Sequence, residues 1–171
     1  VVLAGYYKGD HPEPPDDEPP VGKVARYAWG RDYHVVLREL LLDLGVWLRQ
    51  RAKELGIEAQ IDCRPCVDSA PLDERALAVR AGLGFIGKNG LLIDPKGGSW
   101  TLIGILMMSL ELPPDEPVRD PAATCGTCRR CLDVCPTGAL EAPWRMDPRR
   151  CLSYLTIEQR EAIPGELAAK M

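Results

Sequence analysis

The spacing of the cysteines constrains this chain more than any other feature of its sequence. Four of the seven cysteines lie between Cys125 and Cys135, in the pattern CxxCxxCxxxCP. Three thiolates at this spacing can surround one cubane 4Fe-4S cluster, while the fourth points to a neighbouring cluster. A structural zinc usually takes two CxxC pairs set further apart, and a c-type haem needs a histidine where Arg129 stands. The motif therefore favours iron-sulfur ligation over zinc or an inert cysteine-rich loop.

The number of ligands indicates that this motif is part of a larger set. Each 4Fe-4S cluster takes four cysteines, so two clusters take eight. The motif offers four, and Cys151, expected to open a helix after Asp147-Pro148, adds one more. We expect a second CxxCxxxCP motif beyond Met171 to supply the remaining ligands. The alternative for Cys151 is a buried, small apolar side chain.

Length and composition fit a globular chain with a genuine core. The 171 residues are 46% hydrophobic and carry a net charge of -4, which excludes disorder, collagen and a non-specific nucleic-acid coat. The longest apolar stretch, 102–110, is far below the roughly 18 residues that cross a bilayer, and there is no signal-peptide pattern. We therefore expect a soluble, cytoplasmic protein. Because the chain begins at Val1, without an initiator Met and in a strand-like apolar run, we treat it as the middle of a longer protein.

The segment before the cysteine motif contains both helical and extended patterns. Five prolines and five acidic residues predict an extended loop over residues 8–20. Apolar residues recur every three or four positions from Asp32 to Leu55, and Gly56 follows, so we expect an amphipathic helix there. Residues 57–61 alternate between apolar and polar side chains, as a strand would.

A second helix, two strands and a linker complete this first part. Pro71 suits a helix start, and we expect that helix to run to Gly82. Strands are predicted at 91–93 and 100–108, joined by a turn at 95–98, and the prolines that follow mark a linker. The alternation argues for an α/β layer, which ends where the composition changes near residue 120.

Asp68 is the first candidate for acid-base chemistry. It lies two residues after Cys66, where a strand is expected to pass into a helix. A carboxyl there could donate protons if an apolar pocket raised its pKa above the ordinary value, and a helix N-cap or a surface charge is the alternative. The Cys63-x-x-Cys66 pair could be a redox dithiol or bind a cluster. Because no thioredoxin-like pattern surrounds it, we favour buried, unligated cysteines.

Three further features have both a functional and a plain structural interpretation. Residues 82–89 match GxGxxG, but they follow a helix and enter a strand, so a tight turn or the approach of a large ligand is favoured over nucleotide binding. His34 lies on the polar side of the first helix, where it can simply be solvated. Several arginines near the cysteines could bind phosphates or balance the acidic residues beside them. These are Arg129, Arg130, Arg145, Arg149 and Arg150.

Several segments, in order along nearly the whole chain, closely resemble the epoxyqueuosine reductase family. They are Tyr27–His34 (YAWGRDYH), Cys66–Pro71 (CVDSAP), Arg80–Asn89 (RAGLGFIGKN), Gly98–Trp100 (GSW), Cys125–Leu140 (CGTCRRCLDVCPTGAL) and Cys151–Glu158 (CLSYLTIE). Members of that family reduce the epoxide of epoxyqueuosine to the alkene of queuosine at the tRNA wobble position. They use cobalamin and two 4Fe-4S clusters.

The resemblance implies a fold and a set of site residues. It implies an α/β (α+β) cobalamin-binding domain over residues 1–120, incomplete at its N-terminus, and the first half of a ferredoxin-like 4Fe-4S domain over residues 121–171. It makes Asp68 the proton donor. The residues implied to contact the corrin are Asp68, Asn89, Ser99 and Ser153. The cysteines implied to bind one cluster are Cys125, Cys128 and Cys131, and those implied to bind the other are Cys135 and Cys151.

The resemblance also implies a reaction and its partners. Two electrons and two protons remove the epoxide oxygen as water, and low-potential clusters supply the electrons. The implied partners are a tRNA whose GUN anticodon stem-loop carries epoxyqueuosine and a low-potential electron donor, and we expect a monomer without membrane attachment. We expect residues 1–171 alone to be inactive. The alternatives are a ferredoxin-type electron carrier without a substrate site, and a cobalamin-dependent reductive dehalogenase.

Overall fold

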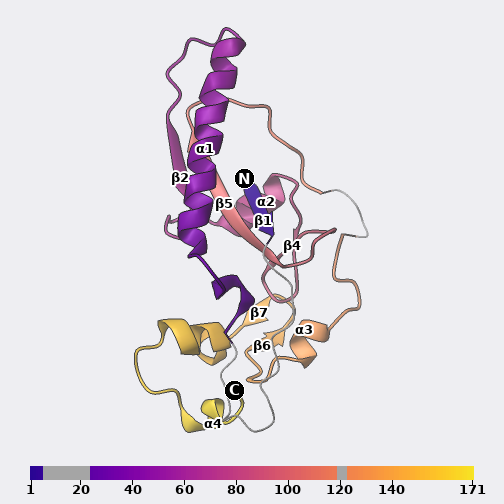
Figure 1. The fold of residues 1–171 in the computed structure, drawn as a ribbon. Coiled ribbons are helices and arrows are strands. Elements are labelled where there is room, and N and C mark those ends of the chain that lie inside the picture. The colour runs from indigo at the N-terminus through magenta and orange to yellow at the C-terminus, as the bar shows by residue number, and fades with distance from the viewer. Residues whose placement is uncertain (6–23, 119–122) are drawn as a thin grey trace.

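The computed structural model describes residues 1–5, 24–118 and 123–171 (Figure 1). A long helix and a small sheet form one part of the molecule, and the cysteine segment lies beyond one end of that sheet. The proline-rich stretch 8–20, predicted as a loop, falls outside the described residues.

The central element is a three-stranded antiparallel sheet in the order β1-β5-β2. Strand β1 spans Val2–Gly5, β2 spans Cys63–Cys66 and β5 spans Thr101–Met108. Val2 pairs with Gly104 and Cys63 pairs with Met108, so β1 and β2 take different halves of the long strand. The predicted strands at the N-terminus and near 100–108 are confirmed. Antiparallel pairing places this part of the chain in the α+β class.

Helix α1, Tyr33–Glu54, packs on this sheet and confirms the predicted amphipathic helix. Asp32 caps its start by accepting the His34 N–H at 2.8 Å. Leu37 and Leu41 are buried with Val67 and form the main core cluster. Gly104 of β5 allows Leu41 to approach closely, because an added Cβ would lie 3.2 Å from its methyl group.

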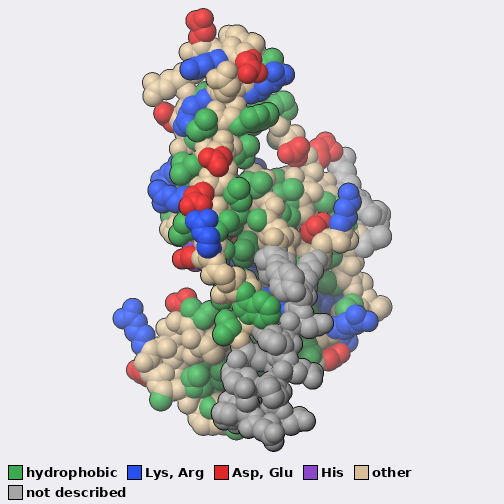
Figure 2. Space-filling model, in the orientation of Figure 1, with side chains coloured by type: hydrophobic (Ala, Val, Ile, Leu, Met, Phe, Trp, Pro, Cys, Tyr) green, Lys and Arg blue, Asp and Glu red, His purple; other side chains and the backbone are tan. Residues whose placement is uncertain are grey.

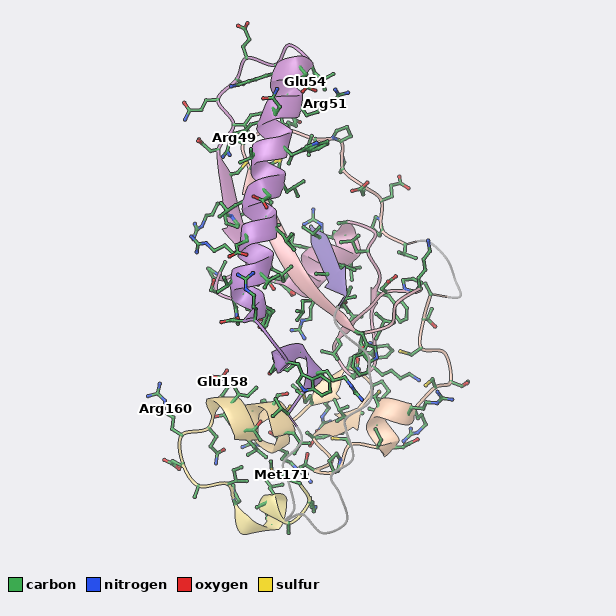
Figure 3. All side chains as sticks on the ribbon, in the orientation of Figure 1. Arg49, Arg51, Glu54, Glu158, Arg160 and Met171 are labelled. Atoms are coloured by element: carbon green, nitrogen blue, oxygen red, sulfur yellow. The ribbon has the colours of Figure 1, made fainter. Side chains whose placement is uncertain are left out.

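The outer side of α1 remains partly apolar. Leu40, Val46 and Trp47 are each more than half exposed. Figure 2 shows hydrophobic side chains gathered beside the charged residues of this helix. Figure 3 places Arg51 and Glu54 at its far end, where their side chains form a salt bridge of 3.0 Å. No helix in the described residues has both the length and the apolar character that a membrane crossing requires.

The strand expected at residues 57–61 is not formed. Strand β2 begins only at Cys63, because its partner β5 ends at Met108. Beyond that pair, Ser109 and Asp62 bond to each other, with the Asp62 N–H donated to Ser109 Oγ at 3.0 Å. Arg49 instead bonds the backbone of this segment, donating from Nε to the Ile61 carbonyl at 2.8 Å (Figure 3).

Helix α2, Glu74–Arg80, is shorter than the predicted span from Pro71 to Gly82. Its start is set by Asp73, whose carboxylate accepts the Ala76 N–H at 3.0 Å and therefore acts as the N-cap. Pro71 lies in the turn that precedes this cap. The predicted end is confirmed, because the chain leaves the helix at Ala81 and enters the left-handed region at Gly82, with φ of 71°.

A short hairpin follows, formed by β3, Phe85–Ile86, and β4, Leu92–Ile93. The predicted strand near 91–93 is therefore confirmed, although β3, its partner, was not predicted. The turn at 95–98 is also present and is closed by pairing of Asp94 with Gly98. Residues 111–118 form neither helix nor strand, in agreement with the predicted linker.

The cysteine segment is built from very short elements. They are α3, Arg130–Asp133; β6, Leu140–Ala142; β7, Arg145–Met146; a 3-10 helix, Pro148–Arg150; a π-helix, Tyr154–Glu158; and α4, Gly165–Ala168. Its buried apolar side chains, within the described residues, are Ala139, Leu155 and Leu167. So small a core leaves room for stabilisation by bound metal.

Candidate functional site

Asp68 lies directly after β2, where the chain turns towards α2. Its backbone adopts a φ of 52°, a left-handed conformation that is uncommon outside glycine. The Ser69 N–H bonds back to the Val67 carbonyl and closes a three-residue turn around Asp68. Val67 and Cys66 are buried, so the packed strand end holds this turn in place. Backbone strain of this kind is concentrated at functional sites.

The polar neighbours of Asp68 come from both helices. The Tyr33 hydroxyl donates a hydrogen bond to Asp68 Oδ2, and His34 Nε2 lies 3.7 Å from the same oxygen. The Asp68 N–H donates to Glu74 Oε1 at 2.9 Å. The Asp68 side chain is 57% exposed, so the described residues do not build the apolar pocket that sequence reasoning required around it.

Tyr33 and Glu74, which contact Asp68, both have raised pKa values. Burial, followed by the hydrogen bond to Asp68, raises the pKa of Tyr33, so this residue remains a protonated donor. Burial also raises the pKa of Glu74. The hydrogen bonds that His34 donates to Asp32 lower the pKa of Asp32. His34 is therefore more than a solvated side chain, because its ring contacts Asp32 through Nδ1 at 2.8 Å and stacks on Tyr33.

Two adjoining clefts, each of about 400 Å³, flank the start of α2 and share Asp73 and Arg75. Asp68 lines one of them, together with Tyr33 and Glu74 from the helices and Thr101–Ile103 from β5. The other cleft lies between the β3–β4 hairpin and the β6–β7 hairpin of the cysteine segment. Its lining residues include Ile86, Lys88, Asn89, Leu140 and Trp144.

The structure brings only some of the four predicted corrin contacts together. Asp68 and Asn89 line neighbouring clefts, whereas Ser99 and Ser153 line neither. Ser99 is half-buried in the turn before β5, and Ser153 is exposed beside the π-helix. The Asn89 side chain is used locally, since its Oδ1 accepts the Leu91 N–H at 3.1 Å.

Hydrogen bonds join the two parts of the chain beside the second cleft, the one that lies between the β3–β4 and β6–β7 hairpins. The Trp144 N–H donates to the Lys88 carbonyl at 2.9 Å, and the Trp144 indole Nε1–H donates to the Ile86 carbonyl at 3.2 Å. Trp144 has a φ of 60°, a second left-handed position outside glycine. The cysteine segment is therefore fixed against the hairpin that follows α2.

The cysteines of the motif have the chemistry that iron-sulfur clusters require. All seven cysteines of the chain are free thiols. Burial would raise the pKa of the Cys135 thiol, but hydrogen bonds from the backbone of Leu140 and Ala139 and from Thr137 outweigh it and lower that pKa. The Cys125 sulfur accepts the Lys88 N–H at 3.4 Å. Donors of this kind stabilise thiolate ligands.

The described residues contain no group of three His, Cys, Asp or Glu side chains that could hold a single metal ion. A cubane distributes its thiolates over separate irons, so the sulfur atoms around it stand further apart than those around one ion. Free thiols at the CxxCxxCxxxCP spacing are the donors that a 4Fe-4S cluster takes. Cys151 lies three residues before the start of the π-helix, and its carbonyl accepts the Leu155 N–H at 2.9 Å.

Cys63 and Cys66 lie on β2, away from the motif. Cys66 is buried and Cys63 is half-buried, and both are free thiols. An added Cβ at Gly45 of α1 would lie 3.4 Å from the Cys63 sulfur, so this thiol packs against the helix. Their positions are those of core side chains in a sheet.

Two other sequence features have structural explanations. A Cβ added at Gly84 would lie 2.2 Å from the Ile93 carbonyl oxygen, and one at Gly82 would lie 2.4 Å from the Glu116 carbonyl oxygen. Close backbone packing thus accounts for these glycines, and the segment follows a helix and enters a strand as predicted. Three of the five arginines pair with acidic neighbours, which favours charge balance over a phosphate patch. The pairs are Arg129–Asp133, Arg145–Glu141 and Arg149–Asp147.

Sequence reasoning did not assign a role to Tyr33, Glu74 or Trp144. Tyr33 lies within a segment that resembled the family, and that was the only signal pointing to it. Glu74 lies within the helix that was predicted from Pro71 to Gly82, and nothing in its local pattern marked it as a neighbour of Asp68. No pattern in the sequence indicated that Trp144 would reach the hairpin, because the two are more than fifty residues apart.

Comparisons with known proteins match both parts of the chain. The family described as "Epoxyqueuosine reductase QueG, DUF1730" matches residues 1–69, and the family described as "4Fe-4S double cluster binding domain" matches residues 124–171. An epoxyqueuosine reductase of Synechococcus sp. is 50% identical over 163 residues, which covers 94% of this chain and 46% of the relative.

Solved structures agree with these matches. Epoxyqueuosine reductase from Streptococcus thermophilus superposes with a TM-score of 0.84 at 36% identity over 98% of this chain and 43% of that chain. An epoxyqueuosine reductase with an epoxyqueuosine-modified tRNA stem loop gives 0.75 at 33% identity over 98% of this chain and 42% of that one. The Bacillus subtilis enzyme, solved with its catalytic aspartate loop swung out of the active site, gives 0.74 at 33% with the same coverage.

These matches run through both the helix-and-sheet part and the cysteine segment. The chain spans about half the length of the curated relatives and solved structures that it matches. The agreement in sequence, in fold and in the cysteine pattern leads to one conclusion, which is that this chain belongs to the epoxyqueuosine reductase family.

Proposed function

We propose that this chain is the part of an epoxyqueuosine reductase that carries the proton donor and the first cluster-binding motif. The observation that carries this proposal is the position of Asp68, which a strained turn holds in one cleft, next to a second cleft that is lined in part by the cysteine segment. A carboxyl group at one end and cluster ligands at the other suit a reaction that needs both protons and electrons.

The reaction converts an epoxide, two electrons and two protons into an alkene and water. In our proposal Asp68 protonates the departing epoxide oxygen, which is otherwise a poor leaving group. The Tyr33 hydroxyl occupies Oδ2, so Oδ1 is the atom that carries the proton. His34 is half exposed, and its Nε2 lies 3.7 Å from Oδ2 of the same carboxyl group, so it adds a second polar neighbour on the side of the Tyr33 hydroxyl.

Cobalamin is the cofactor that the family implies, and the clefts support it. Two cavities of about 400 Å³ each, which share the lining residues Asp73 and Arg75, together offer more room than a small metabolite needs. We assign Asp68 and Asn89, which line the clefts, to its binding, together with Ser99 and Ser153, which lie outside them, and take residues 1–120 as the cobalamin domain. When bound, this cofactor supplies a cobalt centre that takes up single electrons for the reduction.

The cysteine segment, residues 121–171, would hold the electron-supplying clusters in a ferredoxin-like arrangement. We assign Cys125, Cys128 and Cys131 to one 4Fe-4S cluster, and Cys135 and Cys151 to the other. The bonds from Trp144 to the hairpin keep this segment at the rim of the second cleft.

The substrate in this proposal is a tRNA anticodon stem-loop of the GUN type that carries epoxyqueuosine. One solved relative is described with an epoxyqueuosine-modified tRNA stem loop, which supports the assignment. We further propose that the whole protein acts as a cytoplasmic monomer and takes electrons from a low-potential donor.

The substitution Asp68→Asn tests the proposed proton donor in the whole protein. The amide keeps the shape of the side chain but cannot donate the same proton, so alkene formation should fall by roughly 10²–10⁴-fold while iron and cobalt contents stay unchanged. Asp62→Asn, on an exposed residue before β2, is the matched control and should retain activity.

The same preparation separates the alternatives. An electron carrier without a substrate site would purify without corrin absorbance, and a dehalogenase would reduce organohalides in place of the modified tRNA. An Asp68→Asn variant that forms queuosine at the normal rate would refute the role of this carboxyl group.

A further inference from the structure

Lys88 joins the β3–β4 hairpin to the loop that carries the first two motif cysteines. Its Nζ donates hydrogen bonds to the Gly126 carbonyl at 2.7 Å and to the Cys128 carbonyl at 2.9 Å. Its backbone N–H donates to the Cys125 sulfur at 3.4 Å. One residue therefore places both a positive charge and an N–H donor against the Cys125–Cys128 loop.

Among the described residues, no acidic side chain is paired with the ammonium group of Lys88. Arg129 in the same region, by contrast, pairs with Asp133 at 3.3 Å. Lys88 is also partly buried, so solvent screens its charge less than that of an exposed lysine. The positive charge of Lys88 therefore affects the electrostatic potential at the Cys125–Cys128 loop more than the charge of the paired, exposed Arg129 does.

This arrangement has a direct electrostatic consequence for a cluster. Reduction adds one electron and hence one negative charge to a 4Fe-4S cluster, and hydrogen bonds to sulfur and nearby charges set the reduction potential. A cation and an N–H donor both stabilise the more negative, reduced form. They therefore raise the potential of the cluster beside them and leave a more distant one unaffected.

We propose that Lys88 is a positioning residue that raises the reduction potential of the cluster bound by Cys125, Cys128 and Cys131. Lys88 also lines the second cleft, so the residue that tunes this cluster borders the proposed cofactor site. The inference rests on the cluster ligation stated under Proposed function. It adds a specific device by which the helix-and-sheet part controls electron delivery.

The test is a potentiometric titration of the whole, anaerobically purified protein, with the reduced clusters followed by electron paramagnetic resonance. Lys88→Gln removes the charge but keeps a side-chain donor. We expect one of the two clusters to become about tenfold harder to reduce, which is about 59 mV for one electron, and the other to be unchanged. Lys88→Arg keeps the charge and should match the wild type. Lys96→Gln, on an exposed lysine in the 95–98 turn, is the matched control.

Each result supports or overturns the inference. Potentials in Lys88→Gln that equal those of the wild type, or that shift equally for both clusters, overturn it. If Lys88→Gln purifies without one cluster, the Lys88→Arg variant is the test. A full cluster content with the wild-type reduction potential in Lys88→Arg supports the inference. A changed reduction potential in Lys88→Arg overturns it. If the wild-type protein gives no cluster signals, the proposed cluster ligation is itself wrong. That result contradicts the proposed function, and it is seen before any variant is measured.

Discussion

At the scale of single residues, the geometry around Asp68 follows from its backbone. Aspartate tolerates the left-handed region better than most residues, because its short polar side chain can bond locally. Here that conformation ends β2 abruptly and turns the carboxylate towards Tyr33. The Asp68 N–H is then free of the sheet and is satisfied by Glu74. One unusual φ angle thus accompanies two contacts of the proposed donor, with Tyr33 and with Glu74.

Tyr33→Phe tests whether the hydroxyl positions Asp68. The change removes a hydrogen bond to a charged group, a type worth about 1.5–3 kcal/mol, so the rate of epoxide reduction should fall roughly tenfold or more with little change in iron content. Activity is measured as queuosine formed on a modified anticodon stem-loop.

Tyr27→Phe is the matched control, because the Tyr27 ring packs edge-on against Tyr33 at 5.9 Å and keeps that contact as phenylalanine. We expect it to behave as the wild type. Equal rate losses in the two variants would show that the ring cluster matters and that the Tyr33 hydroxyl has no separate role.

At the scale of elements, the hairpin after α2 is the connection between the two parts of the chain. Its short strands allow Gly84 to pack under the Ile93 carbonyl, and its turn carries Lys88 to the cysteine loop. Because β3 and β4 contain only two residues each, this position depends on close backbone contact more than on strand pairing.

Gly84→Ala should destabilise the protein strongly. The added Cβ would lie 2.2 Å from the Ile93 carbonyl oxygen, so the backbone of β4 must move. We expect a loss of about 2–4 kcal/mol in the free energy of unfolding, seen as a lower midpoint in thermal unfolding of the whole protein.

Gly165→Ala serves for comparison, because a Cβ on this α4 residue meets nothing within 4 Å. Alanine favours helix over glycine, so its midpoint should be unchanged or slightly higher. A Gly84→Ala protein as stable as Gly165→Ala would contradict the close packing described for the hairpin.

The boundaries of elements were harder to predict than their existence. The long helix was predictable because its apolar period and its Asp32 cap are local in sequence. The start of α2 was predicted too early, because Pro71 and Asp73 both suit a helix start. The structure shows that Asp73 is the N-cap, since its carboxylate accepts the Ala76 N–H. The strand expected at 57–61 failed because β5 offers it no partner, and strand pairing is non-local.

At the scale of the whole molecule, the described part of the cysteine segment has a smaller apolar core than the helix-and-sheet part. The described residues of this segment bury few apolar side chains, and its elements are too short to be stable alone. Metal binding would therefore contribute to folding as well as to electron transfer.

Cys151→Ser tests the proposed division of ligands. If Cys151 binds the second cluster, its loss should lower the iron content of the whole protein from about eight to about four per chain, with the first cluster's spectrum retained. Iron and acid-labile sulfide are measured after anaerobic purification. Cys63→Ala, which removes a thiol packed against α1, should keep the full iron content. If the iron content per chain is equal in the two variants, Cys151 is not a cluster ligand and is instead a small apolar side chain.

Spacing along the chain was sufficient to predict the long helix, the central strand, the cluster motif and Asp68 as a candidate donor, because each depends on a few neighbouring residues. The partners of those residues were decided only by packing. Tyr33 meets Asp68 across 35 positions, and the Lys88 N–H meets the Cys125 sulfur across 37. Contacts over such separations depend on how sheet, helices and hairpin fit together, and no local pattern encodes that fit.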